Sequence, residues 1–156
     1  MPLVHHLHSS PNCDARPADI VVDTVVLHAT VLDTLSEVIE KFSDPESRVS
    51  AHYSIDRDGT TVMHVPEDQR AWHAGQSQMK DGRKHVNDFS IGIELVNRND
   101  GLDPYPAAQI RSMRALLKGI LVRHPIQFIV THRDCADPPG RKSDPVGFDP
   151  SWIQGL

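Results

Sequence analysis

Short apolar stretches recur along this chain, and five of them predict β-strands. Residues 20–27 are almost continuously β-branched and apolar, which is typical of a strand that is covered on both faces of a sheet. The other predicted strands are residues 50–55, 61–65, 90–97 and 126–131. Arg57-Asp58-Gly59 separates the second strand from the third and tolerates the positive φ of a tight turn, so these two strands are expected to pair as an antiparallel hairpin.

In two other stretches, apolar residues recur with the period of an α-helix. Thr34 and Glu37 match a helix capping box, and one apolar face follows at Leu35, Val38, Ile39 and Phe42. A second apolar face over residues 110–121 predicts a helix that ends before Pro125. The element order is therefore β-α-β-β-β-α-β, which indicates an α/β fold with a mixed central sheet flanked by helices. Residues 72–88 are long, polar and without a period, which favours a binding loop.

Length and charge narrow the class of protein. A chain of 156 residues suits one domain spanning residues 1–156, with residues 1–19 as an irregular N-terminal segment packed on it. The net charge of −5 and the lack of a basic cluster argue against a nucleic-acid partner. No apolar run approaches the roughly 20 residues that span a bilayer. The N-terminus lacks the pattern of a signal peptide, so a cytoplasmic protein is expected, with a secreted or phage-delivered protein as the alternative. A monomer is also expected.

Cys13 and Cys135 are the only cysteines and make no disulfide framework. Two free thiols in a cytosolic protein are expected, and a single bridge between them is the alternative.

Candidate metal ligands lie where predicted strands end. His28 follows the first strand, His132 follows the last strand, and Asp144 lies in the Pro- and Gly-containing loop after it. The ends of strands joined by crossovers cluster into a crevice, and two imidazoles with one carboxylate leave a zinc ion an open position for water. Considered alone, either histidine would more simply be a strand-end residue that hydrogen-bonds to the backbone. The same three donors also suit a non-haem iron site.

Two further residues have the chemistry of an amide hydrolase. Glu94 interrupts the apolar run of the fourth strand, and Gly92 leaves space on the same face, so Glu94 is a candidate general acid–base. A salt bridge to an arginine is the alternative. Lys142 lies two residues before Asp144 and could stabilise an oxyanion, although it could equally be a solvated surface lysine.

The candidate substrate-binding residues are Trp72, His73, Asn87 and His52. Trp72 and His73 are expected to line the cleft. For His73 and His52, a place beside the metal ligands or a structural role is the stronger alternative.

Several motifs together resemble the zinc-dependent N-acetylmuramoyl-L-alanine amidases, which share a fold with peptidoglycan recognition proteins. They are Ser-Pro-Asn-Cys-Asp-Ala-Arg-Pro at residues 10–17, Val-Leu-His at 26–28, Val-Ser-Ala-His-Tyr at 49–53, Arg-Asp-Gly at 57–59, Arg-Ala-Trp-His-Ala-Gly at 70–75, Asn-Asp-Phe-Ser-Ile-Gly-Ile-Glu at 87–94, Thr-His at 131–132 and Arg-Lys-Ser-Asp-Pro at 141–145. As an ordered set they cover nearly the whole chain, and they are most similar to the branch that acts on anhydro-muropeptides.

The resemblance implies roles for five residues. His28, His132 and Asp144 would bind zinc, and Glu94 and Lys142 would be the catalytic pair. The implied reaction is hydrolysis of the amide bond between N-acetylmuramic acid, or its anhydro form, and L-alanine of the peptidoglycan stem peptide. A non-catalytic module that binds muropeptides is the alternative, and intact wall or soluble fragments both remain open as the substrate.

Overall fold

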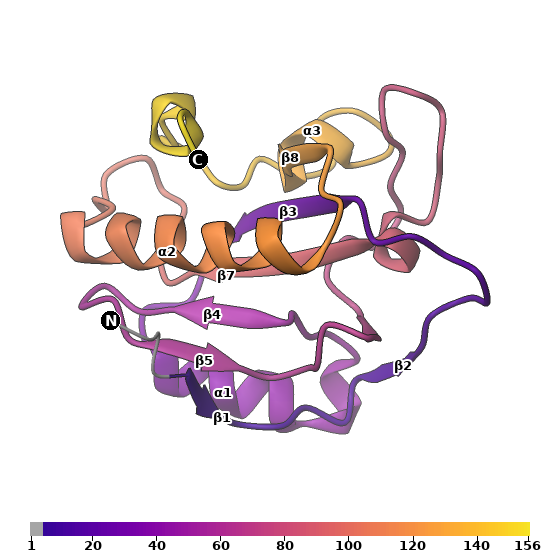
Figure 1. Ribbon diagram of the computed structural model, residues 1–156. Helices are drawn as coiled ribbons and strands as arrows, with labels where there is room; N and C mark the ends of the chain where they lie inside the picture. The colour runs from indigo at the N-terminus through magenta and orange to yellow at the C-terminus, as the bar shows by residue number, and fades with distance from the viewer. Residues whose placement is uncertain (1–4) are drawn as a thin grey trace.

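The computed structural model describes residues 5–156 and has a six-stranded sheet at its centre (Figure 1). In spatial order the strands are β1 (His5–Leu7), β5 (Thr61–Met63), β4 (Tyr53–Ile55), β7 (Ser90–Leu95), β3 (Thr24–Ala29) and β8 (Phe128–Thr131). β4 and β5 are antiparallel, whereas all other neighbours are parallel. The predicted mixed sheet and hairpin are confirmed.

The five predicted strands are present, although their bounds differ from the expected ones. β3 begins at Thr24 because its partner β7 begins at Ser90, directly opposite, after a 3₁₀ turn at Val86–Phe89. It continues through His28 to Ala29 because β7 continues to Leu95. Apolar composition indicated the strand, and the length of its neighbour sets its ends.

Helices cover both faces of the sheet. α2 (Ala107–Arg123) lies across one face and α1 (Leu35–Ser43) lies on the other (Figure 1). The capping box predicted for α1 is present, since Thr34 Oγ1 accepts from Glu37 N and the Glu37 carboxylate accepts from Thr34 N. α2 is longer than expected and ends at Arg123, two residues before Pro125.

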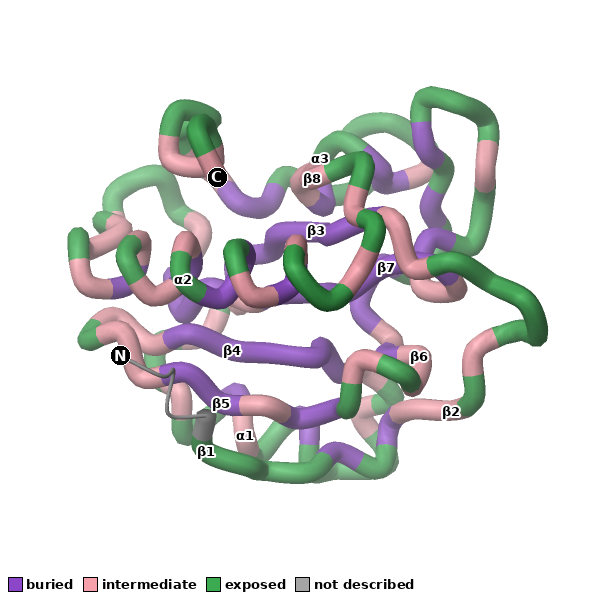
Figure 2. The backbone as a smooth tube through the Cα atoms, in the orientation of Figure 1, coloured by how far each residue is buried: buried purple, intermediate pink, exposed green. Residues whose placement is uncertain are grey.

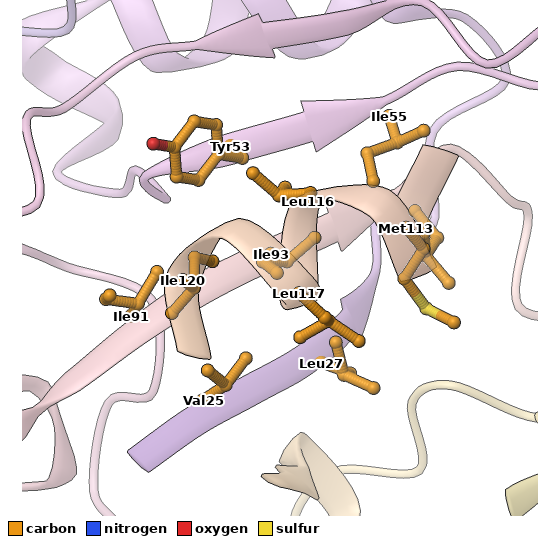
Figure 3. Close-up of a cluster of buried hydrophobic side chains, with 11 residues drawn as sticks. Val25, Leu27, Tyr53, Ile55, Ile91, Ile93, Met113, Leu116, Leu117 and Ile120 are labelled. Atoms are coloured by element: carbon orange, nitrogen blue, oxygen red, sulfur yellow. The ribbon is translucent and has the colours of Figure 1, made fainter. Parts of the chain in front are cut away.

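The main core lies between α2 and the sheet, with the strands buried at its centre (Figures 2 and 3). Its buried members are Val25, Leu27, Tyr53, Ile55, Ile91, Ile93, Leu95, Met113, Leu116, Leu117 and Ile120. Fully burying a side chain of this kind is worth about 1.5–3 kcal/mol, so this layer stabilises the sheet on its α2 side. Val38 and Phe42 of α1 pack with Ala51 and Val96 in a separate cluster.

The two faces of β7 differ as its alternation predicts. Ile91, Ile93 and Leu95 enter the core under α2. Gly92 and Glu94 lie on the opposite face, because successive side chains of a strand alternate. That face, towards the carboxyl ends of the parallel strands, is where the candidate site forms.

The N-terminal segment is more regular than expected. The prediction that residues 1–19 are irregular is wrong for β1, which pairs with β5, and for β2 (Cys13–Ala15), which pairs with β6 (Gln69–Ala71). Residues 1–4 lie outside the described part of the chain. Asn12 attaches this segment to the domain, since its side-chain amide donates to the carbonyls of Asp44 and Val49.

A short helix, α3 (His132–Cys135), was also not predicted. Cys13 and Cys135 are unbridged. Across residues 5–156, no helix has both the length and the apolar character that crossing a membrane requires.

Candidate functional site

Three buried side chains meet at the carboxyl ends of β3 and β8. His28 is the penultimate residue of β3, His132 directly follows β8 as the first residue of α3, and Asp144 lies in the loop beyond. One donor atom from each lies within 4.8 Å of the other two, an arrangement that could hold a metal ion. The predicted association of these three residues is therefore present in the structure.

The donor atoms are close and point towards one another. Nδ1 of His28 lies 3.0 Å from Nδ1 of His132 and 3.5 Å from Oδ2 of Asp144. Nδ1 of His132 lies 3.2 Å from Oδ1 of Asp144. Asp144 Oδ2 also accepts from the backbone N–H of Ala29 at 3.3 Å, which attaches the loop carboxylate to the end of β3.

The surroundings orient His132 and set the charge of the other two groups. Nε2 of His132 lies 3.1 Å from the carbonyl of Ala74, which only accepts, so Nε2 carries a hydrogen. Burial lowers the pKa of His28 to about 4, so its imidazole is neutral at pH 7. Burial alone would raise the pKa of Asp144, but hydrogen bonds with His132 and His28 hold it well below its usual range.

Glu94 lies beside this group, opposite His28 in the β3–β7 register. Its Oε1 is 3.9 Å from Nδ1 of His28, and its Oε2 is buried without a hydrogen-bond partner. Burial, and then the charge of Asp144, raise the pKa of Glu94 to about 8. Within residues 5–156 no arginine pairs with Glu94, so the salt-bridge alternative is wrong. The unpartnered Oε2 of a carboxyl that lines a cavity is available to a reacting molecule.

A cleft opens over these residues and extends in two directions. One cavity, of about 340 Å³, lies towards α1 and is lined by polar and apolar residues that include His28, Glu94, His132, Lys142 and Asp144. A second cavity, of about 230 Å³, adjoins it and shares His132 and Lys142. The exposed Lys142 lines both cavities, so a ligand that lies along the cleft passes its ammonium group.

The candidate substrate-binding residues divide into two groups. Trp72, His73 and Asn87 line the cleft, although the Asn87 side chain also accepts from the backbone N–H groups of His73 and Ala74. His52 is 0% exposed and lines neither cavity. The structure therefore places His52 outside the cleft, away from the other candidate substrate-binding residues.

His52 instead contacts the backbone of two other segments. Its Nδ1 accepts from the backbone N–H of Gly92 at 3.0 Å, and its Nε2 lies 3.0 Å from the carbonyl of Gln69.

Sequence reasoning missed three cations that line the cleft. Lys41 of α1 lines the larger cavity, and its spacing of three residues from Val38 was a signal that both share one side of the helix. Arg48 and Arg141 line the smaller cavity. Arg141 also joins two loops, since its Nη2 donates to the carbonyls of Ala74 and Gln76.

Comparison with known sequences gives a consistent result. Residues 17–147 match the model of a family described as N-acetylmuramoyl-L-alanine amidase. The 1,6-anhydro-N-acetylmuramyl-L-alanine amidase AmpD of Escherichia coli K12 is 37% identical to this chain, over 87% of this chain and 82% of AmpD. The N-acetylmuramoyl-L-alanine amidase AmiD of the same organism is 35% identical, over 85% of this chain and 51% of AmiD.

Solved structures show the same fold. A selenomethionine derivative of AmpD superposes with a TM-score of 0.85 at 34% identity, over 98% of this chain and 93% of that one. AmiD from E. coli, in complex with the substrate anhydro-N-acetylmuramic acid-L-Ala-D-gamma-Glu-L-Lys, gives a TM-score of 0.70 at 32% identity, over 83% of this chain and 55% of that one.

Proposed function

Because this chain belongs to the N-acetylmuramoyl-L-alanine amidase family, we propose that it is a zinc amidase that releases stem peptides from muropeptides. The bond cleaved joins the lactyl group of N-acetylmuramic acid to L-alanine. The observation that carries this proposal is the buried group of His28, His132 and Asp144, with Glu94 beside it, whose Oε2 has no hydrogen-bond partner, in an open cleft.

The donor set fits zinc. Two imidazole nitrogens and one carboxylate oxygen converge beneath a cavity, and three such ligands with an open fourth position are the pattern of catalytic zinc sites. When bound, zinc lowers the pKa of a water molecule towards 7 and polarises a carbonyl group. A module that only binds muropeptides needs neither this group nor a buried acid, so both features support catalysis over the non-catalytic alternative.

The chain's own residues supply the remaining chemistry. A metal cation in the neighbouring site would favour the ionised form of Glu94. Glu94 would then accept a proton from the attacking water and return it to the nitrogen of the leaving alanine, which has to depart as an amine. Lys142 donates to the carbonyl oxygen as negative charge develops there. Both groups line the same cavity as the three ligand candidates, so one bound amide can reach all of them.

For the substrate, we propose a soluble muropeptide that carries the anhydro sugar, handled in the cytoplasm. AmpD is named for 1,6-anhydro-N-acetylmuramyl-L-alanine, and this chain spans 82% of its length. The substrate in the AmiD complex also has the anhydro sugar.

Product analysis tests this function. Purified protein is incubated with soluble anhydro-muropeptides and, separately, with intact sacculi, and released stem peptides are identified by mass spectrometry. Free peptides that begin with L-alanine are expected, formed faster from the soluble fragments. Bound but uncut muropeptide would show a binding module, and faster release from sacculi would contradict the proposed substrate.

Lys142→Met is expected to lower kcat by about 10²–10³-fold, the usual cost of removing one oxyanion donor. The developing charge exists only in the transition state, so zinc content and KM should remain near those of the wild type. Steady-state kinetics and metal analysis measure both. Lys118→Met, on an exposed position of α2 outside the cleft, is the matched control. Unchanged kcat in Lys142→Met would mean a solvated surface lysine, and loss of zinc would mean that Lys142 organises the loop of Asp144.

A further inference from the structure

His73 makes a contact with His28 that the proposed reaction does not use. Its Nδ1 lies 2.9 Å from Nε2 of His28, on the side of that ring away from His132 and Asp144. The two rings meet edge to face, with centroids 5.0 Å apart and planes at 90°. On its other side, Nε2 of His73 lies 3.1 Å from Oγ of Ser90. His73 is only 8% exposed, so it offers little surface to a substrate.

The backbone around His73 is arranged to admit its ring. A Cβ atom on Gly92 would lie 2.5 Å from Cγ of His73, closer than real Cβ contacts come. Any other residue at position 92 would therefore displace this imidazole. Asn87 holds the His73 segment, since its Oδ1 accepts from the N–H groups of His73 and Ala74 at 3.2 and 2.9 Å.

Hydrogen-bond chemistry sets the direction of the contact. If Nδ1 of His28 presents its lone pair to a metal ion, the hydrogen of that neutral ring has to be on Nε2. Nδ1 of His73 is then the acceptor, and the hydrogen of His73 lies on Nε2, where it donates to Ser90.

We propose that His73 is a positioning residue, which fixes the orientation and tautomer of His28 for zinc. The inference rests on the proposed zinc amidase. The carbonyl of the next residue, Ala74, does the same for His132. Two consecutive residues of one loop thus orient both imidazole ligands, and Asn87 holds that loop through its side chain. Outer partners of this kind are typically worth 10–100-fold in metal affinity.

Three substitutions of His73 separate this role from simple packing. His73→Asn places an amide oxygen near the former Nδ1, so it can still accept from His28. His73→Gln places its amide near the former Nε2, towards Ser90, and His73→Leu has no acceptor at all. His64→Gln is the matched control, because His64 is also buried but contacts Ser54 Oγ and the carbonyl of His8, away from the metal group.

Zinc affinity is measured on the full-length protein by competition with a chromophoric chelator, and the melting temperature is measured in the metal-free form. His73→Leu and His73→Gln are expected to raise the Kd for zinc by about 10–100-fold. His73→Asn should remain within about threefold of the wild type on the same reasoning. The control should lose thermal stability but keep its zinc affinity. If His73 had only a structural role, its variants would behave in the same way as this control.

Wild-type affinity in His73→Leu and His73→Gln would overturn the role of His73, and so would a loss in His73→Asn as large as in His73→Gln. If His73→Leu does not fold, the Asn and Gln variants still decide between the two positions of the amide. A wild-type chain that takes up no zinc would instead overturn the proposed metal site.

Discussion

Asp144→Ala is expected to lose zinc and to hydrolyse muropeptides no faster than the metal-free protein. The substitution removes one of three donor atoms that lie within 4.8 Å of one another, and the only carboxylate oxygen among them. Because outer partners of a ligand are already worth 10–100-fold in metal affinity, losing a ligand itself should raise the Kd for zinc by more than about 100-fold. Metal content after gel filtration, together with kcat/KM for a soluble muropeptide, measures the effect.

Chelation extends the same prediction to the wild type. Removal of the metal should abolish hydrolysis, and one equivalent of zinc per chain should restore it. Recovery with ferrous iron alone would instead favour the facial-triad alternative that the same donors allow. Asp149→Ala is the matched control, because Asp149 is an exposed carboxylate of the same C-terminal stretch that bonds only to Ser151 N among its described contacts. Full activity in metal-free protein would contradict the metal site.

The sequence predicted the parts of the fold that local pattern determines. The run of β-branched residues before His28 and the alternation around Glu94 identified β3 and β7, and the Thr34–Glu37 pair identified the start of α1. These signals depend on neighbours a few residues apart, which is why they survive without any knowledge of the tertiary structure.

What the sequence could not predict depends on contacts between distant segments. β1 is three residues long and exists because β5 offers it an edge, and β2 exists because β6 does. The same limit applies to the site.

His28, His132 and Asp144 could be proposed as a group because strand ends converge, but the hydrogen-bond partners of His52 and His73 could not be predicted. His52 meets the N–H of Gly92 and His73 meets His28, across 40 and 45 residues of chain respectively.

Glu94→Gln is expected to lower kcat by about 10²–10⁴-fold, the usual contribution of a positioned general acid–base. The variant keeps the shape of the side chain but cannot take a proton from water. Zinc content and affinity for uncut muropeptide should stay near wild type, because Glu94 is not among the three donor atoms. Steady-state kinetics, metal analysis and binding of muropeptide by calorimetry distinguish these quantities, and wild-type kcat would reduce Glu94 to a structural partner.

Stability provides an independent measurement on the metal-free protein. Burial and Asp144 raise the pKa of Glu94 to about 8 in the folded chain, against 4.5 for an ordinary glutamate. Below pH 4 both the folded and unfolded states hold the proton, so glutamate and glutamine should differ little. Between pH 5 and 8 only the unfolded state releases it, so the free energy of unfolding of the wild type falls as pH rises. Glu94→Gln removes this loss, and at pH 8 the metal-free variant should be more stable than the wild type by about 4 kcal/mol, because each pKa unit corresponds to about 1.4 kcal/mol. Urea unfolding at pH 4, 6 and 8 measures the difference, and a gap that does not grow with pH would show that Glu94 is ionised and stabilised in the fold. A gain in stability together with a loss of turnover is the expected result for a group buried for catalysis.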